Sequence, residues 1–148
     1  MLWEEVADLI LIIAREIQFQ GYGDNGVHSL TPSEGMVMRH LHSQPASRPN
    51  RIAAAVGLQR TNLSSVLSGL ERKGLIERHV DAGDKRSVTI EVTDLGRSNY
   101  ALVRRAWGQM VRRAADRQGV GARSDIAAAL ELLRRVESGL TAHRIGAD

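Results

Sequence analysis

The sequence of 148 residues contains no cysteine. A disulfide scaffold, a zinc site with cysteine ligands and a thiol redox switch are therefore excluded. Aromatic residues make up only 3% of the chain, so the core must consist mainly of Leu, Ile, Val and Ala, a composition that favours helices. The hydrophobic content of 43% is typical of globular proteins, and we expect a single domain, residues 1–148, with a core of its own.

Lysine is also scarce. Of the 20 basic residues only Lys73 and Lys85 are lysines, and the rest are arginines, which make forked contacts to phosphates and base edges. Positions 35–70 contain no acidic residue, yet they include Arg39, Arg48, Arg51 and Arg60. This segment therefore has a local positive field, as expected of a surface that meets a polyanion.

Long hydrophobic runs are absent as well. The first twenty residues lack the basic start of a secretion signal, and several charged residues interrupt them. The apolar run 9–14 is too short to span a bilayer. We therefore expect no membrane segment and a soluble cytoplasmic protein.

The hydrophobic periodicity predicts six helices and one hairpin in the order α-α-α-α-β-β-α-α. Thr31, Pro32 and Glu34 form a helix start with a capping box, and Thr93 caps a long helix near the C-terminus. The expected helices cover about 2–20, 32–43, 50–56, 59–73, 94–117 and 124–140. The fold class is mainly α (α+β).

The pattern of segment 49–73 predicts a short helix, a turn with Gly57 and a longer helix, which together form a helix-turn-helix unit. On the longer helix, helical spacing directs one face to the core, formed by Leu63, Val66, Leu67 and Leu70. The opposite face has short hydroxyls, an amide and arginines, which suit close approach to base edges. These candidate DNA-binding residues are Arg60, Thr61, Asn62, Ser64, Ser65, Ser68 and Arg72.

A β-hairpin is predicted directly after this unit, with strands 76–80 and 87–92. Both strands alternate apolar and polar residues, which predicts one buried face of Ile76, Val80, Val88, Ile90 and Val92. Asp81, Gly83 and Asp84 supply turn chemistry between the strands. The loop ends in the basic pair Lys85–Arg86, which we expect to contact DNA.

Four segments together resemble the MarR family of bacterial transcription regulators, which are winged helix-turn-helix dimers. They are 51–58 (RIAAAVGL), 70–78 (LERKGLIER), 81–86 (DAGDKR) and 92–96 (VTDLG). The resemblance implies a winged helix-turn-helix DNA-binding lobe over 30–95. It also implies that residues 1–22 and 96–148 form a helical dimerisation region.

The same resemblance implies roles for individual residues. Helix 59–73 would read the major groove, and Arg86 would enter the minor groove from the wing, residues 78–89. Asp84 would hold the wing in place, and we expect it to do so through an ion pair with an arginine. Family members often have an acidic residue where this chain has Asn50 and Arg51, so we expect an extra phosphate contact from Arg51. Arg48 and Asn50 beside it are further candidate DNA-binding residues.

The long helix 94–117 includes residues of a candidate effector site. Arg97, Arg104, Arg105 and Arg112 recur along the fifth helix, where a solvated stripe is one interpretation and an anion-binding wall is the other. If a small aromatic or anionic effector binds between the dimer region and the DNA-binding lobe, Tyr22, Tyr100 and Trp107 are its candidate lining. The five histidines form no recognisable ligand set, so we expect no metal site and no cofactor.

No catalytic grouping stands out, and we predict that the chain is not an enzyme. The predicted function is a homodimeric, sequence-specific regulator of transcription that binds a near-palindromic operator in double-stranded DNA. We expect it to act as a repressor released by a small-molecule effector. The alternatives are a sequence-independent basic DNA-binding or nucleoid protein and a winged-helix protein-interaction module.

Overall fold

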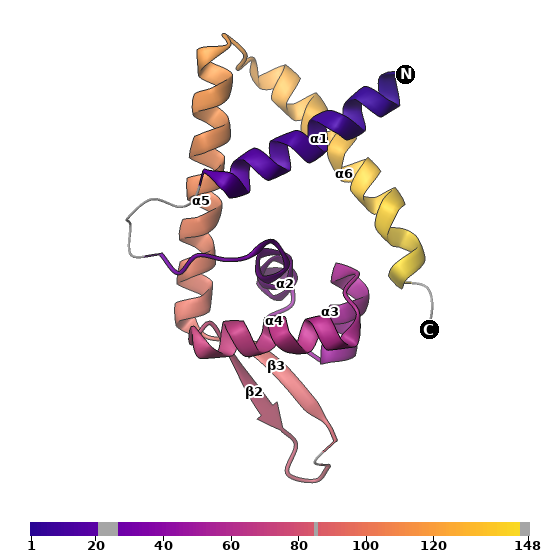
Figure 1. The fold of residues 1–148 in the computed structure, drawn as a ribbon, viewed down its shortest axis with the longest axis vertical. Coiled ribbons are helices and arrows are strands. Elements are labelled where there is room, and N and C mark those ends of the chain that lie inside the picture. The colour runs from indigo at the N-terminus through magenta and orange to yellow at the C-terminus, as the bar shows by residue number, and fades with distance from the viewer. Residues whose placement is uncertain (21–26, 85, 146–148) are drawn as a thin grey trace.

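The computed structural model describes residues 1–20, 27–84 and 86–145 (Figure 1). The predicted order of helices and hairpin is confirmed, with one short strand added. The elements are α1 (Leu2–Phe19), α2 (Pro32–Ser43), β1 (Ala46–Ser47), α3 (Pro49–Val56), α4 (Arg60–Arg72), β2 (Ile76–Val80), β3 (Val88–Val92), α5 (Asp94–Arg117) and α6 (Arg123–Ile145).

The predicted helix caps are present. Thr31 Oγ1 accepts a hydrogen bond from the Glu34 backbone N–H at 3.2 Å, and the Glu34 carboxylate accepts one from the Thr31 N–H at 2.8 Å. The Thr93 hydroxyl likewise accepts from the Gly96 N–H at 2.9 Å and begins α5. At the end of α3, Gly57 has a φ of +70°, a left-handed conformation that glycine adopts without steric cost.

The sheet is antiparallel, with the strand order β1-β3-β2. The two residues of β1 pair with Glu91 and Ile90, and they are too few to produce an alternation visible in the sequence. Ile76, Ile90 and Val92 are buried as predicted, and Val88 is half-buried. The prediction for Val80 is wrong: this side chain is 58% exposed, because the hairpin extends beyond the core of the lobe (Figure 1).

The buried core lies in the helix-turn-helix lobe, residues 30–95, and the adjoining part of α5. Leu63, Leu67 and Leu70 on α4 are buried as predicted, whereas Val66 is half-buried. They pack with apolar residues from the other elements of the lobe, including Val37, Met38, Leu41, Ile52, Leu75, Ile76 and Ile90. This core fixes the inner face of α4 and leaves its outer face free.

The remaining helices lie away from the wing. In Figure 1, α5 runs from the hairpin to the far end of the molecule, α6 returns from there toward α3, and α1 crosses near them. Neither α1 nor α6 has a buried residue among those described. None of the described helices combines the length and the apolar character needed to cross a membrane.

Candidate nucleic-acid interface

The outer face of α4 is exposed and has no acidic side chain before Glu71. Its predicted contact residues are all exposed to solvent: Arg60, Thr61, Asn62, Ser64, Ser65, Ser68 and Arg72. The buried leucines on the opposite side hold this face outward. The arrangement provides hydroxyl, amide and guanidinium groups for base edges and phosphates.

The orientation of α4 is also set by a buried ion pair that the sequence did not indicate. Lys73, at the end of α4, donates to the Glu34 carboxylate of α2 at 2.6 Å and to the Ser29 carbonyl at 2.8 Å. Glu34 is only 5% exposed, and its carboxylate lies against Gly69, where an added Cβ would be 2.8 Å from Oε1. Helix α4 is therefore joined to α2 along its last turn.

The start of α3 contributes a second group of exposed basic and polar residues. Arg48 stands at the N-cap of α3, and Asn50 and Arg51 follow in its first turn, where the Asn50 Oδ1 accepts from the Arg51 N–H at 2.9 Å. These three line a surface concavity together with Arg144 of α6. Arg144 was not among the predicted residues, since helical periodicity in α6 does not reveal which element its end approaches.

The wing loop is held by its own backbone and two aspartates. Asp84 Oδ1 accepts from the Arg86 backbone N–H at 2.9 Å, and Asp81 Oδ1 accepts from the Gly83 N–H at 3.0 Å. The Asp84 carbonyl accepts from the Ser87 N–H at 2.9 Å. Asp84 thus holds Arg86 through a backbone hydrogen bond, and within the described part of the chain the predicted ion pair between Asp84 and an arginine is not formed. Arg86 is exposed, and Lys85 lies outside the described residues.

Arg78 on β2 is a residue that the prediction missed. It lines a shallow groove between α4 and the hairpin with Arg60, Thr61 and Ser64, and its Nε donates to the Glu71 carboxylate at 3.1 Å. The alternation of β2 could have indicated it, because Arg78 interrupts the apolar face between Ile76 and Val80.

Two cavities flank α2, one of them lined by two of the predicted aromatic residues. A cavity of about 380 Å³ between α1, α2 and α5 is lined by Tyr100 and Trp107, with mainly apolar neighbours such as Ile17 and Met36. Tyr22 lies outside the described residues. Of the three predicted effector residues, Tyr100 and Trp107 thus line the same cavity.

The second cavity, of about 370 Å³, is more polar and lies between α2, α3, α5 and α6. Arg104 lines it with its guanidinium carbon 6.0 Å from the centre of the Tyr100 ring, and its Nη1 is 3.3 Å from His42 Nε2. Burial raises the pKa of Tyr100, and the nearby Arg104 and Arg39 oppose this effect.

The arginines of α5 do not form one continuous wall. Arg97 instead contacts Asp94 and the Val92 carbonyl, and Arg112 lies 3.8 Å from Asp116. Of the four arginines in the predicted stripe, Arg104 is the one that lines this cavity. Within the described ranges, no cluster of three or more His, Asp or Glu side chains is placed to hold a metal ion.

Comparison with known proteins agrees with this geometry. A model of the MarR family matches residues 30–88, which cover most of the DNA-binding lobe. The chain is also 29% identical over 96 residues to YkoM, an HTH-type transcriptional regulator of Bacillus subtilis (strain 168). The segment 30–88 of this chain is thus similar to the MarR family. The alignment with YkoM covers 63% of this chain and 62% of that relative, which is less than two thirds of its length.

Solved structures show that the MarR fold extends beyond the matched segment. The transcriptional regulator SlyA superposes with a TM-score of 0.73 at 22% identity, over 94% of this chain and 96% of that one. A probable transcriptional regulator from Pseudomonas aeruginosa gives a TM-score of 0.67 at 18% identity, over 92% and 99%.

A third structure concerns regulation of DNA binding of Bordetella bronchiseptica BpsR by 6-hydroxynicotinic acid. It gives a TM-score of 0.65 at 18% identity, over 90% and 98%. The predicted fold class, a mainly helical winged helix-turn-helix, is confirmed. YkoM and SlyA are both named as transcriptional regulators.

Proposed function

We propose that this chain is a regulator of the MarR type: homodimeric, binding DNA sequence-specifically and acting as a repressor. The observation that carries the proposal is the exposed face of α4, rich in hydroxyls and arginines, beside a wing with exposed Arg86. The α4 side chains would read base edges in the major groove, and Arg86 would sense the charge and width of the adjacent minor groove. Arg48, Asn50 and Arg51 would contact phosphates.

Support for a dimer comes from the apolar side chains that α1 and α6 expose. Soluble proteins rarely leave large apolar surfaces uncovered, and a second copy of the chain is the occupant we propose. A two-fold dimer would place two α4 helices in successive major grooves, about 34 Å apart, on a near-palindromic operator. The exposed residues include Leu9, Ile10 and Ile13 on α1, and Ile126, Leu130 and Leu133 on α6.

Release from DNA by a small aromatic or anionic effector is part of the same proposal. The cavity between α1, α2 and α5 separates the dimerisation region from the DNA-binding lobe and contains Tyr100 and Trp107. BpsR, whose DNA binding 6-hydroxynicotinic acid regulates, has a similar fold. A ligand that favours a lobe spacing incompatible with DNA would weaken DNA binding, and DNA would weaken ligand binding by the same factor. A regulator of genomic DNA would act in the cytoplasm.

The test begins with in vitro selection of bound DNA by the full chain. Affinity is then measured for the selected palindrome and for a scrambled duplex at two salt concentrations. We expect the palindrome to bind more tightly at both. Equal affinities with a steep salt dependence would leave only sequence-independent phosphate binding and would refute the proposal.

The wing is tested separately with Arg86→Ala. We expect the affinity for the selected palindrome to fall roughly tenfold or more, because one minor-groove arginine is lost. Arg113→Ala, an exposed arginine of α5 far along the chain from the lobe, is the matched control and should bind normally. Unchanged affinity of the Arg86 variant would remove the wing from the mechanism.

A further inference from the structure

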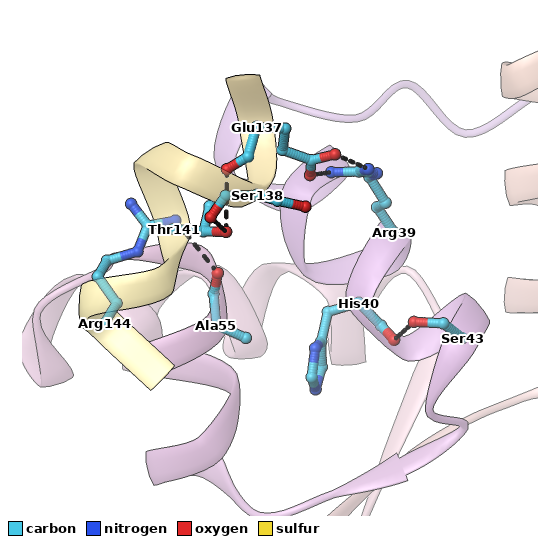
Figure 2. A network of polar contacts seen from close by, with 8 residues as sticks. All are labelled: Arg39, His40, Ser43, Ala55, Glu137, Ser138, Thr141 and Arg144. Carbon is cyan, nitrogen blue, oxygen red and sulfur yellow. Dashed lines mark hydrogen bonds and ion pairs between the residues drawn. The ribbon is translucent and has the colours of Figure 1, made fainter. Parts of the chain in front are cut away.

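The second half of α6 contacts the DNA-binding lobe of its own chain (Figure 2). Arg39 of α2 and Glu137 of α6 form a two-point ion pair, with Nη1 2.5 Å from Oε1 and Nη2 3.0 Å from Oε2. Such fork-to-fork geometry is directional, so it sets the relative orientation of α2 and α6 as well as their distance.

A second contact lies two turns later on α6. The Arg144 Nη2 donates to the Ala55 carbonyl in the last turn of α3 at 3.4 Å. The guanidinium also lies against Gly57, where an added Cβ would be 2.8 Å from Nη1. A cation at this position interacts favourably with the carbonyl end of α3, the first helix of the helix-turn-helix.

Both residues lie on the face of α6 that is otherwise apolar. At 100° per residue, Glu137 and Arg144 fall within about 20° of Ile126 around the helix axis. The apolar stripe of Ile126, Leu130, Leu133 and Leu140 therefore also includes Glu137 and Arg144 where α6 passes over the DNA-binding lobe. Glu137 and Arg144 therefore lie on the same side of α6 as the proposed dimer surface.

The contacts of α6 with α2 and α3 restrain the orientation of the DNA-binding lobe. In Figure 1, the lobe joins the dimerisation helices on one side through the chain itself, where β3 continues into α5, and α6 reaches it on the other side at α3. The lobe packs along the first half of α5, and the contacts of α6 with α2 and α3 restrain the side of the lobe that lies away from α5. We propose that Glu137 and Arg144 of α6 are positioning residues that set the orientation of the helix-turn-helix, and hence the half-site spacing that the dimer accepts.

This inference rests on the proposed function, but it assigns α6 a role in DNA recognition beyond dimerisation. We expect the Arg39–Glu137 ion pair to matter for this orientation and not for the stability of the fold. The Arg39 and Glu137 side chains are 56% and 44% exposed, and exposed ion pairs contribute little to the stability of a fold. In the proposed role, this ion pair favours one orientation of the lobe over the others.

The first experiment measures spacing preference. Duplexes carry the selected half-sites at the native separation or moved by one or two base pairs, and a further duplex carries one half-site. One exposed pair shifts an equilibrium roughly two- to fivefold, and a dimer contains two, so Glu137→Gln should bind the native spacing roughly tenfold more weakly. Its dependence on spacing should flatten, and its binding to the single half-site should be unchanged. Arg144→Gln should flatten the profile in the same way.

Two variants control this experiment. Glu131→Gln removes an exposed carboxylate of the same helix, and we expect the wild-type profile. The exchanged pair Arg39→Glu with Glu137→Arg restores the attraction and should recover the spacing preference. If the wild type discriminates between spacings and Glu137→Gln discriminates equally well, the positioning role is refuted while the proposed function stands.

A second experiment needs no DNA, so it tests the inference even if the proposed function fails. Because the chain has no cysteine, Ser65→Cys on α4 and Arg123→Cys on α6 provide two unique spin-label sites. Labelled chains are diluted with unlabelled ones, and the distance distribution within one chain is measured. We expect a narrow distribution, broadened by Glu137→Gln and narrowed again in the exchanged pair. A distribution of unchanged width would overturn the inference.

Discussion

Gly96, in the first turn of α5, lies close to the backbone of Leu75, just before β2, and to Val92 at the end of β3. A Cβ added there would lie 2.0 Å from the Leu75 carbonyl oxygen and 2.9 Å from both the Leu75 carbonyl carbon and Val92 Cγ2. An ordinary contact between carbon and oxygen is about 3.3 Å, so Gly96→Ala must move backbone by roughly 1 Å. The same Leu75 carbonyl accepts a hydrogen bond from the Thr93 N–H at 3.1 Å, which such a movement would break.

The magnitude follows from three contributions. Overpacking against backbone costs about 3 kcal/mol, and the lost hydrogen bond costs about 1 kcal/mol. The better helix propensity of alanine offsets about 1 kcal/mol. We therefore expect Gly96→Ala to lower the free energy of unfolding by about 3 kcal/mol.

Gly108 provides the matched control on the same helix. No atom lies within 4 Å of a Cβ added there, so Gly108→Ala should raise the free energy of unfolding by up to about 1 kcal/mol through helix propensity. Both variants are compared with the wild type by equilibrium unfolding in urea at one fixed protein concentration, because the stability of a dimer depends on concentration. If the two variants differ by less than about 1 kcal/mol, the close approach at Gly96 is not rigid and the reasoning fails.

Three further predictions use the same unfolding assay. Lys73→Met leaves the buried Glu34 carboxylate without its cation and should cost about 3 kcal/mol; a loss below about 0.5 kcal/mol would show that the pair does not hold α4. Asn99→Leu removes two hydrogen bonds to the His28 backbone, at 2.8 and 3.0 Å, and should cost about 2 kcal/mol, whereas wild-type stability would contradict a structural role for this buried amide. Burial lowers the pKa of His40 from its ordinary value of 6.5, so the unfolded chain binds a proton at higher pH than the folded one. The free energy of unfolding should therefore decrease as the pH falls below that value. Between about pH 8 and about pH 5, this decrease should be smaller in His40→Gln than in the wild type. If the two proteins lose stability in parallel, His40 is not a source of the decrease.

Much of the DNA-binding lobe was predictable from short-range patterns. The capping box at Thr31, the cap at Thr93 and the inward face of α4 each depend on residues within a few positions of one another, so periodicity and local hydrogen-bonding chemistry suffice to predict them. The prediction failed at Val80, because alternation indicates which side of a strand is apolar and does not indicate how far the core extends beneath it. It also assigned Asp84 an ion pair, where the turn geometry provides a backbone hydrogen bond.

The sequence by itself determined the elements, the exposed polar face of α4 and the wing with Arg86, since each follows from spacing along one segment. Only the tertiary structure decided which distant segments meet: Lys73 with Glu34, Gly96 with the Leu75 carbonyl, and Arg39 with Glu137. The physical reason is that these contacts join residues between 21 and 98 positions apart and depend on how whole helices pack. Helix packing is set by the summed shape of many side chains, and no local pattern records it.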